Sequence, residues 1–312
     1  MQNQIHTVLG ASGATGRLVI KELQIKNYRI RAVERNPKND DIDYVAADLL
    51  NADDAIKAIK GSAYVYLCVG LPYQAKVWQR EWPTLMRNVI NACEKANVVL
   101  IFLDNVYMYE QPFAVPFSEN QPQNPTTIKG KTRKKTTDLL LNAIASKKIQ
   151  GVIGRSADFY GEYATNSMFY PSFLENLLKG KSGQYLSKKG VLHTYAYLED
   201  NAKALVALAT DPTTYGQVWH LPVGKPISPF ELNKLMNDSL GVDYELKYIP
   251  AFIRKLLGLF IKPIAEVEEM LYQFETDYVM DCQKFMTHFP DFVVTPYEIG
   301  LSKMVQSFQK EK

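Results

Sequence analysis

Three glycines near the amino end of the chain, Gly10, Gly13 and Gly16, limit its fold more than any other feature. They follow a short apolar run at residues 5–9, typical of a β-strand, and lead directly into an amphipathic helical pattern at residues 17–26. At such a junction the free N–H groups of the helix favour negative charge, and residues without a Cβ let a pyrophosphate approach the backbone. Gly10 permits the tight turn, Gly13 the close approach and Gly16 the packing of helix on strand. The segment therefore predicts a dinucleotide site in the first βαβ unit.

The first half of the chain alternates apolar, β-branched runs with longer helical patterns. The predicted strands are residues 5–9, 29–33, 43–46, 64–69, 98–103 and 150–154. Several of them are almost continuously apolar, as expected for strands that are covered on both faces. Helices are predicted at residues 17–26, 78–96 and 131–146. This alternation predicts an α/β fold with a doubly wound parallel sheet of the Rossmann type.

After about residue 154 the pattern changes to isolated helices and short strands, which indicates a second lobe. Helices are expected at residues 168–178, 201–210 and 229–240, and strands at residues 217–221 and 244–248. The run 251–261 is apolar but too short to span a bilayer, so we expect a buried or lid helix there. We predict a Rossmann domain over residues 1–155, with part of 193–225 returning to it, and a smaller α+β substrate-binding lobe over residues 156–312.

Composition and residue spacing exclude several classes of function. The 36 Lys and Arg residues exceed the 33 Asp and Glu residues too narrowly to indicate a nucleic-acid partner. Cys68, Cys93 and Cys282 are widely separated, and the histidines show no metal-ligand spacing, so neither a disulfide framework nor a metal site is expected. The sequence also lacks a membrane-spanning apolar run and a signal-peptide pattern. We therefore expect a cytoplasmic protein that binds a small molecule rather than a nucleic acid or a membrane.

The glycine spacing, with two residues between successive glycines, resembles that of the extended and atypical short-chain dehydrogenase/reductases, which include NAD-dependent epimerases and dehydratases. The segments at residues 155–161 and 193–200 resemble later motifs of this family, in the same order. The resemblance implies that the cofactor is contacted by the glycine turn and by the ends of the second, third and fourth strands. The implied cofactor residues are Gly10, Ser12, Gly13, Ala14, Thr15, Gly16, Glu34, Arg35, Asp48, Leu49, Cys68, Val69 and Gly70.

Two adjacent residues at the end of the second strand favour different cofactors. Glu34 takes the place of the family acid that accepts hydrogen bonds from the adenosine ribose of NAD. Arg35 resembles a position where a guanidinium meets the 2′-phosphate of NADP, which a nearby carboxylate would repel unless it turned away. The alternative to cofactor binding is that Glu34 and Arg35 form a solvated pair at the surface. The expected cofactor is therefore NADP or NAD, with NADP slightly favoured.

The catalytic positions that the resemblance implies are altered in this chain. In the family a Tyr-x-x-x-Lys pair on one helix, with a Ser or Thr after the fifth strand, handles the proton that accompanies hydride transfer. Here Lys129 and Arg133 stand in place of that pair, and Asn105 in place of the hydroxyl residue. A partly buried lysine beside a guanidinium can serve as a general base or proton donor. We expect Lys129 to move the proton, Arg133 to hold the nicotinamide ribose and Asn105 to orient a substrate oxygen, with Tyr107 as a further candidate acid.

Substrate contacts are expected mainly from the second lobe, which closes over the nicotinamide in extended members of the family. The candidate residues are Tyr73, Trp78, Asp158, Tyr160, His193 and Tyr195. The aromatic rings among them would form a flat apolar wall, and the tyrosine hydroxyl groups would give direction to polar contacts. A packing role is the alternative for each of them. For His193 this packing role would be that of a hydrogen-bonded histidine that fixes the start of the segment at residues 193–200.

Three functions are consistent with these observations. The first is an NAD(P)-dependent oxidoreductase acting on a small carbonyl, alcohol or conjugated compound. The second is a catalytically degenerate NAD(P)-binding redox sensor, since the family tyrosine and hydroxyl residue are missing; residues 129–135 would then be a solvated basic helix start. A nucleotide-sugar epimerase is third, because that chemistry uses the absent tyrosine directly. The resemblance also implies a possible homodimer through helices 78–96 and 131–146.

Overall fold

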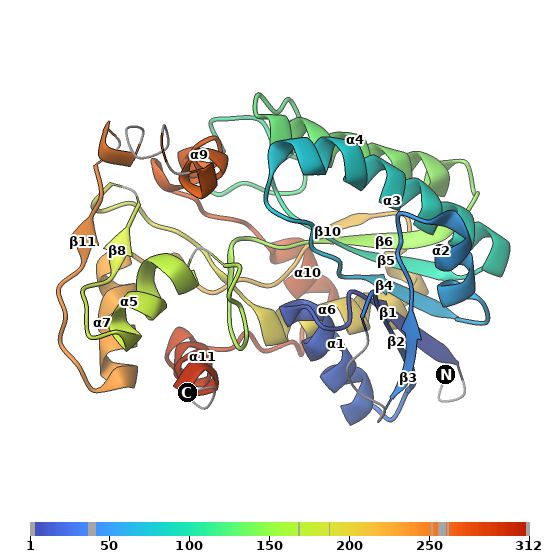
Figure 1. Cartoon of the computed structure of the whole chain (residues 1–312), viewed down its shortest axis with the longest axis horizontal. Helices are drawn as coiled ribbons and strands as arrows, with labels where there is room; N and C mark the ends of the chain where they lie inside the picture. Colours follow the sequence, from blue (N-terminus) through green and yellow to red (C-terminus); the bar gives the residue numbers. More distant parts are fainter. Residues whose placement is uncertain are drawn as a thin grey trace. The chain divides into compact units, whose positions relative to one another are not determined.

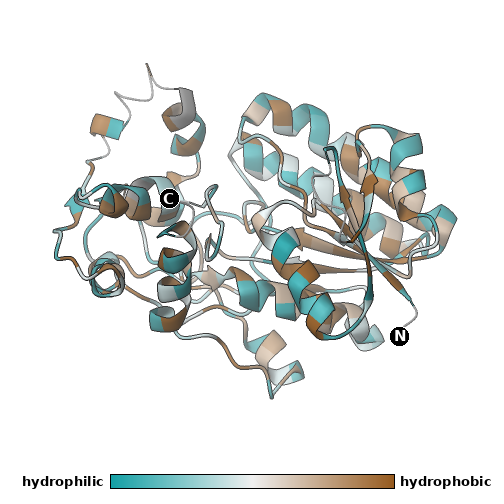
Figure 2. Ribbon diagram, turned by 60° about the horizontal axis from the view of Figure 1, so that its bottom comes forward, coloured by the Kyte–Doolittle hydropathy of each residue, from teal (hydrophilic) through white to brown (hydrophobic). Residues whose placement is uncertain are grey.

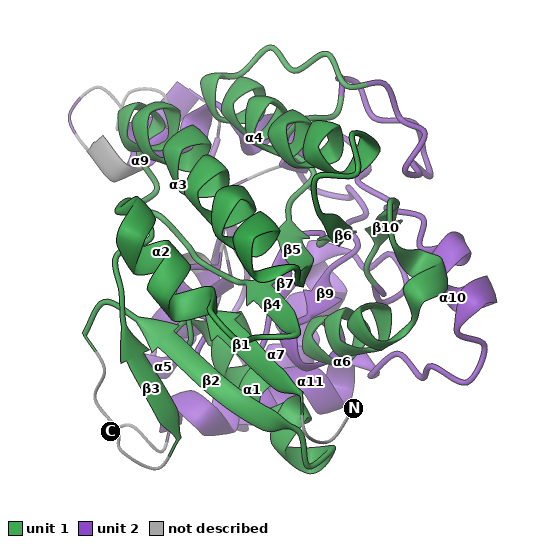
Figure 3. Ribbon diagram, turned by 90° about the vertical axis from the view of Figure 1, so that its right-hand side faces the viewer, with its two compact units in different colours: residues 1–109, 123–156, 201–221 green, residues 110–122, 157–200, 222–312 purple. Residues whose placement is uncertain are grey.

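The structure is a computed structural model that describes residues 4–36, 42–167, 169–186, 188–250, 252–254, 260 and 262–309. The chain forms two compact units (Figure 3). Unit 1 comprises residues 1–109, 123–156 and 201–221, and unit 2 comprises residues 110–122, 157–200 and 222–312. Residues 110–122, which the sequence places in the first domain, belong to unit 2. Most of the helix expected at residues 251–261 lies outside the described residues.

A seven-stranded parallel sheet forms the centre of unit 1, in the order β10-β6-β5-β4-β1-β2-β3 (Figure 1). Its strands are β1 (Ile5–Leu9), β2 (Arg29–Glu34), β3 (Asp43–Ala46), β4 (Tyr64–Leu67), β5 (Val99–Asp104), β6 (Gln150–Arg155) and β10 (Val218–His220). The chain moves outward from β1 to β2 and β3, and then continues in the other direction from β4, which lies on the other side of β1. Ligands of such sheets bind at the carboxyl ends of the strands, beside this reversal.

Helices cover both faces of this sheet (Figure 1). The helices α2 (Ala52–Ile59), α3 (Ala75–Ala96) and α4 (Ile128–Ala145) lie on one face, and α1 (Ala14–Ile25) and α6 (Leu198–Thr210) on the other. Figure 2 shows mostly apolar strands and polar outer faces on the helices of this unit. On α3, Leu85, Met86 and Val89 are at most 2% exposed, and burial of each such side chain contributes about 1.5–3 kcal/mol. The doubly wound parallel sheet predicted from the sequence is confirmed.

The helix α2 is not predicted from the sequence, although its start carries a recognisable signal. The side chain of Asn51 accepts hydrogen bonds from the backbone N–H groups of Asp53 and Asp54, at 2.9 and 3.2 Å. The two acids also favour a helix start, because negative charge there complements the helix dipole. The helix has only 8 residues, so its apolar periodicity is too short to be recognised by itself.

Unit 2 combines two small parallel sheets with helices. The strands β7 (Phe159–Tyr160) and β9 (Ala196–Tyr197) form one pair, and β8 (Gln184–Tyr185) and β11 (Lys247–Tyr248) form the other. The helices are α5 (Glu175–Leu178), α7 (Pro229–Leu240), α9 (Lys262–Glu268), α10 (Gln283–His288) and α11 (Tyr297–Gln309). The helix expected at 168–178 is a π-helical turn at Tyr170–Leu174 followed by α5. Only the last two residues of the strand expected at 244–248 pair. Among the described residues, no helix combines the length and apolar character that crossing a bilayer requires.

His6, on β1, is a titratable group buried in the core of unit 1. Its ring stacks on Tyr28 and Tyr64, with centroids 4.4 and 4.6 Å apart, and its Nδ1 atom lies 3.0 Å from the hydroxyl of Tyr66. Burial lowers the pKa of His6 from 6.5 to about 4, because a charged imidazole would lose its hydration there.

We predict that unit 1 loses stability as the pH falls from neutral. The unfolded chain protonates His6 near pH 6.5, whereas the folded chain does so only near pH 4. The stabilisation from neutral His6 is therefore complete above the pKa of the unfolded chain, 6.5, and is lost as the pH falls toward the pKa of the folded chain, about 4. The free energy of unfolding should fall by about 2 kcal/mol between roughly pH 7 and 5. All 3 tryptophans, Trp78, Trp82 and Trp219, lie in unit 1. Urea unfolding followed by tryptophan fluorescence therefore measures this change.

The control for this prediction is the variant His6→Gln, which does not titrate in this range. Its free energy of unfolding should depend less steeply on pH than that of the natural protein. If the free energy of unfolding depends equally on pH in the two proteins, a group other than His6 causes the loss of stability.

Candidate functional site

The turn between β1 and α1 keeps side chains away from the start of the helix. Gly10 has a φ of +84°, and a Cβ on it would lie 2.9 Å from the Cα of Val69. A Cβ on Gly16 would lie 2.1 Å from the carbonyl oxygen of Gly10, and one on Gly13 would lie 3.3 Å from the same oxygen. No acidic residue occupies the first turn of α1. Of the other expected cofactor residues in this turn, Ser12 is exposed, Ala14 is half-buried and Thr15 is buried.

Main-chain hydrogen bonds hold the end of β2 against the glycine turn. The N–H groups of Gly10 and Ala11 donate to the carbonyl oxygen of Val33 at 3.0 and 3.2 Å. Glu34 and Arg35 follow directly, with Glu34 half-buried and Arg35 exposed. Both residues expected to distinguish NAD from NADP therefore lie beside the turn.

The ends of β3 and β4 complete the set of expected cofactor segments. The N–H of Cys68 donates to the carbonyl oxygen of Leu9 at 3.0 Å, so residues 68–70 leave the sheet beside the glycine turn. After β3, Asp48 is exposed, and its carboxylate accepts the N–H of Leu50 at 3.0 Å. The side chain of Leu49 packs in the core. Of the two expected cofactor residues after β3, only Asp48 therefore presents its side chain at the surface.

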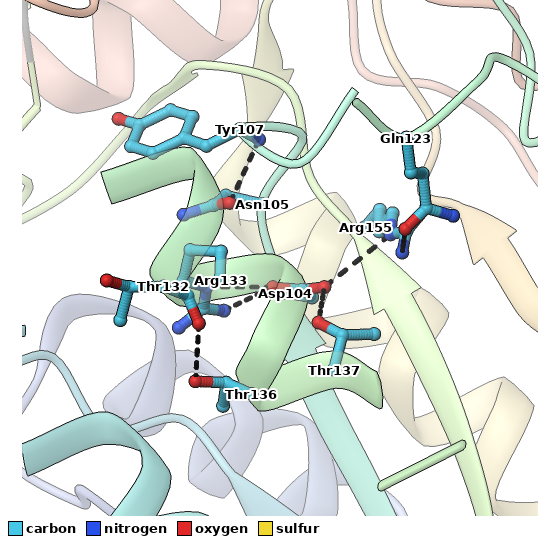
Figure 4. Close-up of polar contacts among 9 residues, drawn as sticks. All are labelled: Asp104, Asn105, Tyr107, Gln123, Thr132, Arg133, Thr136, Thr137 and Arg155. Atoms are coloured by element: carbon cyan, nitrogen blue, oxygen red, sulfur yellow. Dashed lines mark hydrogen bonds and ion pairs between the residues drawn. The ribbon is translucent and has the colours of Figure 1, made fainter. Parts of the chain in front are cut away.

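A buried ion-pair cluster lies at the end of β5, one strand beyond β4 (Figure 4). Arg133 donates through Nε to Asp104 Oδ1 at 3.0 Å, and its Nη2 forms an ion pair with the same oxygen. Thr137 Oγ1 donates to Asp104 Oδ2 at 2.8 Å, and Arg155 Nε lies 3.5 Å from that oxygen. The carboxylate of Asp104 thus connects β5 to α4 and to β6.

Strand register brings further polar residues of this edge together. Asp104 is paired with Arg155 across β5 and β6, and Arg155 with His220 across β6 and β10. The hydroxyl of Tyr109 lies 2.6 Å from His220 Nε2, and the guanidinium of Arg155 lies 4.8 Å from the centroid of the Tyr109 ring. Gln123 accepts a weak hydrogen bond from Arg155 at 3.5 Å. Three neighbouring strand ends therefore share one buried polar network.

The partners of Arg133 differ from those expected from the sequence. Its guanidinium was expected to hold the nicotinamide ribose, but Arg133 is 3% exposed and paired with Asp104. It also lies over the rings of Trp82 and Phe102, at 4.4 and 5.0 Å from their centroids. Since its Nε and Nη2 atoms are bound to Asp104 and its guanidinium lies against two aromatic rings, Arg133 anchors α4 in this structure.

Lys129, one helical turn before Arg133, is completely buried. Its Nζ atom lies 4.7 Å from the centroid of the Tyr73 ring, and the hydroxyl of Tyr73 donates to that of Tyr107 at 3.3 Å. The carboxamide oxygen of Asn105 accepts the backbone N–H of Tyr107 at 3.1 Å (Figure 4). The expected catalytic residues Asn105, Tyr107 and Lys129 are thus gathered at the end of β5 and the start of α4.

The outer face of α4 has a different character from its inner face. Lys131 and Lys135 are exposed there, and Lys134 forms an ion pair with Asp138 at 2.8 Å. These four side chains, with residues 123–125, Leu139 and Asn142, line an open groove of about 560 Å³. The basic run is therefore divided: Lys129 and Arg133 are buried, whereas its other cations are at the surface.

The substrate residues expected in the second lobe are mostly core residues of unit 2. Tyr160, His193 and Tyr195 are at most 2% exposed. The ring of His193 stacks on that of Tyr278. Its Nε2 atom lies 3.0 Å from Oδ2 of Asp158, within hydrogen-bond distance. Burial lowers the pKa of His193, although Asp158 opposes the shift. Packing therefore uses three of the candidates in unit 2, whereas the fourth, Asp158, is half-buried. Trp78, in unit 1, is likewise buried, whereas Tyr73 is half-buried.

Sequence reasoning missed Asp104, Thr137 and Arg155 as members of the site. A signal for Thr137 was present, because Lys129, Arg133 and Thr137 follow one another at four-residue steps and so share a helix face. Asp104 and Arg155 each directly follow a predicted strand, 98–103 and 150–154, and charges of opposite sign at neighbouring strand ends are positioned to pair. Among the described residues, no group of three or more His, Cys, Asp or Glu side chains is arranged to hold a metal ion.

We predict that Asp104→Asn destabilises unit 1 by about 3–5 kcal/mol, because it leaves two buried guanidinium groups without their counter-charge. The matched control is Asp43→Asn, which removes a carboxylate that is 52% exposed and paired with Arg31. That change should cost about 1 kcal/mol or less. Urea unfolding followed by tryptophan fluorescence compares the two variants. Equal losses would contradict a central role for the buried pair.

Solved structures with this fold include several enzymes of nucleotide-sugar metabolism. The UDP-N-acetylglucosamine 4-epimerase from Methanobrevibacter ruminantium M1, solved with UDP-N-acetylmuramic acid, is 18% identical with a TM-score of 0.81 over 100% of both chains. The UDP-glucuronic acid 4-epimerase from Bacillus cereus, solved with NAD, is 16% identical with a TM-score of 0.80 over 99% of both chains. The dTDP-glucose 4,6-dehydratase from Streptomyces venezuelae, solved with NAD, is 15% identical with a TM-score of 0.79 over 98% of this chain and 97% of that chain.

The sequence itself gives a more specific assignment than these distant structures. A search of curated protein sequences found no match. Residues 6–221, which include the glycine turn and the buried network at the strand ends, match the model of one protein family. This match spans more than half of the chain and agrees with the resemblance that the motifs predict. The chain therefore belongs to the NAD dependent epimerase/dehydratase family.

Proposed function

We propose that the chain is an NAD(P)-dependent oxidoreductase that holds its cofactor in unit 1, at the carboxyl ends of β1, β2 and β4. The observation that carries the proposal is the glycine turn, where no Cβ separates a ligand from the first turn of α1. The N–H groups of that turn have no acceptor within the helix, and together with the helix dipole they favour a diphosphate. The family and the NAD complexes of the Bacillus cereus and Streptomyces venezuelae enzymes support this cofactor class.

The residues beside the turn would bind and orient the dinucleotide, which supplies a hydride acceptor or donor. Glu34 would accept hydrogen bonds from the ribose hydroxyls, and Arg35 would pair with a 2′-phosphate. Asp48 would contact the adenine, and residues 68–70 would lie along the nicotinamide half. Arg35 is exposed, so its guanidinium can turn toward an added phosphate. This exposure favours NADP over NAD.

The substrate that fits best is a small molecule carrying an alcohol or a carbonyl group. Asn105, Tyr107 and Lys129 lie together and would manage its oxygen and proton. Nucleotide sugars are candidates because the solved relatives from Methanobrevibacter ruminantium and Bacillus cereus are epimerases of such compounds. A homodimer through α3 and α4 is a further expectation from the resemblance.

A cofactor-binding regulator is the second candidate function. It is favoured by the burial of Lys129 and Arg133, which are 0% and 3% exposed and stand where the family has its tyrosine and lysine. A regulator would bind the oxidised and reduced cofactors with different affinities and oxidise no substrate. An enzyme would consume the reduced cofactor in the presence of a carbonyl compound.

The central test is isothermal titration calorimetry with NADH and NADPH. At least one of them should bind, and Gly13→Ala should weaken that binding by about tenfold or more, because its methyl group stands where the diphosphate would approach. Tryptophan fluorescence during urea unfolding shows whether the variant is folded. Absence of binding to the folded natural protein, even at roughly millimolar cofactor, would overturn the proposal.

The preference between the two cofactors is tested by changing each member of the adjacent pair. Arg35→Ala should weaken NADPH binding by about tenfold, the effect of losing one charge-assisted contact, and leave NADH binding almost unchanged. Glu34→Ala should weaken NADH binding and spare NADPH. Calorimetry of both variants with both cofactors provides the comparison. If neither variant changes the ratio of the two affinities, the pair does not select the cofactor.

A further inference from the structure

The groove on the outer face of α4 is not used by the proposed cofactor site or by the proposed catalytic residues. It lies in unit 1, between one side of α4 and residues 123–125, and has a volume of about 560 Å³. This volume lies within the range of about 300–1,000 Å³ that is typical of sites for small molecules. None of its lining residues is among those expected to contact NAD(P) or the substrate. The groove is therefore a separate candidate site.

Positive charge dominates the lining of this groove. Lys131 and Lys135 are exposed, and neither has an ion-pair partner among the described residues. Side chains four positions apart on a helix are neighbours, so one ligand can contact both lysines. Lys134 pairs at 2.8 Å with Asp138, the single carboxylate among the lining residues. The groove thus offers two free ammonium groups to a negatively charged ligand.

A buried guanidinium lies behind one lining residue of the groove. Gln123 lines the groove and accepts a weak hydrogen bond from Nη2 of Arg155 at 3.5 Å (Figure 4). Arg155 is 0% exposed, and its Nε and Nη1 atoms donate no hydrogen bond within the described part of the chain. Its ion pair with Asp104 is 3.5 Å long, and that carboxylate is also bound by Arg133 and Thr137. A buried guanidinium with so few hydrogen bonds favours a further negatively charged acceptor nearby.

The same features indicate which kind of ligand fits the groove. A second copy of the chain fits poorly, because a two-fold dimer places the same surface of each copy against the other and would bring like-charged lysines together. A phosphate ester has a double negative charge and several acceptor oxygens for the cations. Its organic part would contact Pro125 and Leu139, which also line the groove.

We propose that this groove binds the phosphate group of a small phosphorylated molecule. Lys131 and Lys135 pair with the phosphate oxygens, and Arg155 contributes positive charge from behind Gln123. Unit 1 would then hold two phosphate-binding sites, one at the glycine turn for the cofactor and one on α4. The proposal goes beyond the proposed oxidoreductase function and does not depend on it.

The test is the line width of the phosphorus NMR signals of inorganic phosphate and of glycerol phosphate, each mixed with the full chain. Both signals should broaden at roughly millimolar ligand, and that of glycerol phosphate more strongly. Combining Lys131→Ala with Lys135→Ala should weaken binding by about tenfold or more, the effect of losing charge-assisted contacts. The matched control is Lys57→Ala, which removes an exposed lysine from α2 and should leave the line widths unchanged.

The glycine turn is a second place where phosphate can bind, and it is tested separately. Gly13→Ala should weaken cofactor binding but keep the broadening that depends on the lysines. The double lysine variant should show the opposite behaviour, with normal NADH or NADPH binding in calorimetry. If instead Gly13→Ala removes the broadening and the double lysine variant keeps it, phosphate binds only at the turn and the groove proposal is wrong.

Variants of Gln123 test the contribution of Arg155 without removing the buried guanidinium. Gln123→Glu supplies a carboxylate to Arg155, so it should raise the urea midpoint of unfolding and weaken phosphate binding by about tenfold. Gln123→Met adds no charge and should not raise the midpoint. If Gln123→Glu leaves phosphate binding unchanged or lowers the midpoint, the role assigned to Arg155 is wrong.

A variant that should strengthen binding completes the set. Asp138→Asn removes the only carboxylate that lines the groove, so phosphate affinity should rise by about threefold. A fall in affinity would contradict the proposed electrostatic basis of the site.

Two results would overturn the proposal as a whole. One is that neither compound broadens with the natural protein, or that both broaden equally with a double lysine variant that tryptophan fluorescence shows to be folded. The other is a dimer in size-exclusion chromatography that binds no phosphate and dissociates when Lys131 and Lys135 are replaced. In that case a second copy of the chain, rather than a phosphorylated molecule, covers the groove.

Discussion

The ion pair between Asp104 and Arg133 holds together the parts of unit 1 on which the proposed chemistry depends. Asp104 ends β5, Arg133 belongs to α4, and Arg155 on β6 shares the same carboxylate. Buried charges are costly unless they are paired, so removing one partner is more damaging than never having had the pair. The contact also fixes the rotation of α4 about its axis. As a result, Lys129 points inward, toward the ring of Tyr73.

Much of unit 1 could be predicted because its elements are long and their patterns are regular. The glycine turn, the apolar strands and the apolar face of α3 each combine a composition with a spacing, and each is found within a few residues of its predicted place. The residues proposed to contact the cofactor were chosen by the same reasoning, since most of them follow directly from the ends of parallel strands. The eight-residue helix α2 escaped prediction because it offers little more than a cap.

The roles of individual polar residues were harder to predict, because burial depends on neighbours that are distant in sequence. Arg133 was expected to face a ligand, yet an aspartate 29 positions away and two aromatic rings enclose it. Tyr160, His193 and Tyr195 resemble site residues in sequence, but unit 2 builds its aromatic core from them. Large aromatic rings bury much surface, so they can serve a core as well as a binding site. Residue type alone does not distinguish these two uses.

The division of α4 into a buried cationic face and a solvated one limits which changes the helix can tolerate. Thr127 caps the helix through the N–H of Gly130, so its starting point is fixed just before the inward-facing lysine. Insertion of one residue after this cap would rotate everything beyond it by about 100°. Exposed lysines would then be driven into the interior, and their buried counterparts into water. Substitutions on the side of α4 that lines the groove are therefore tolerated more easily by the fold than an insertion or deletion within the helix.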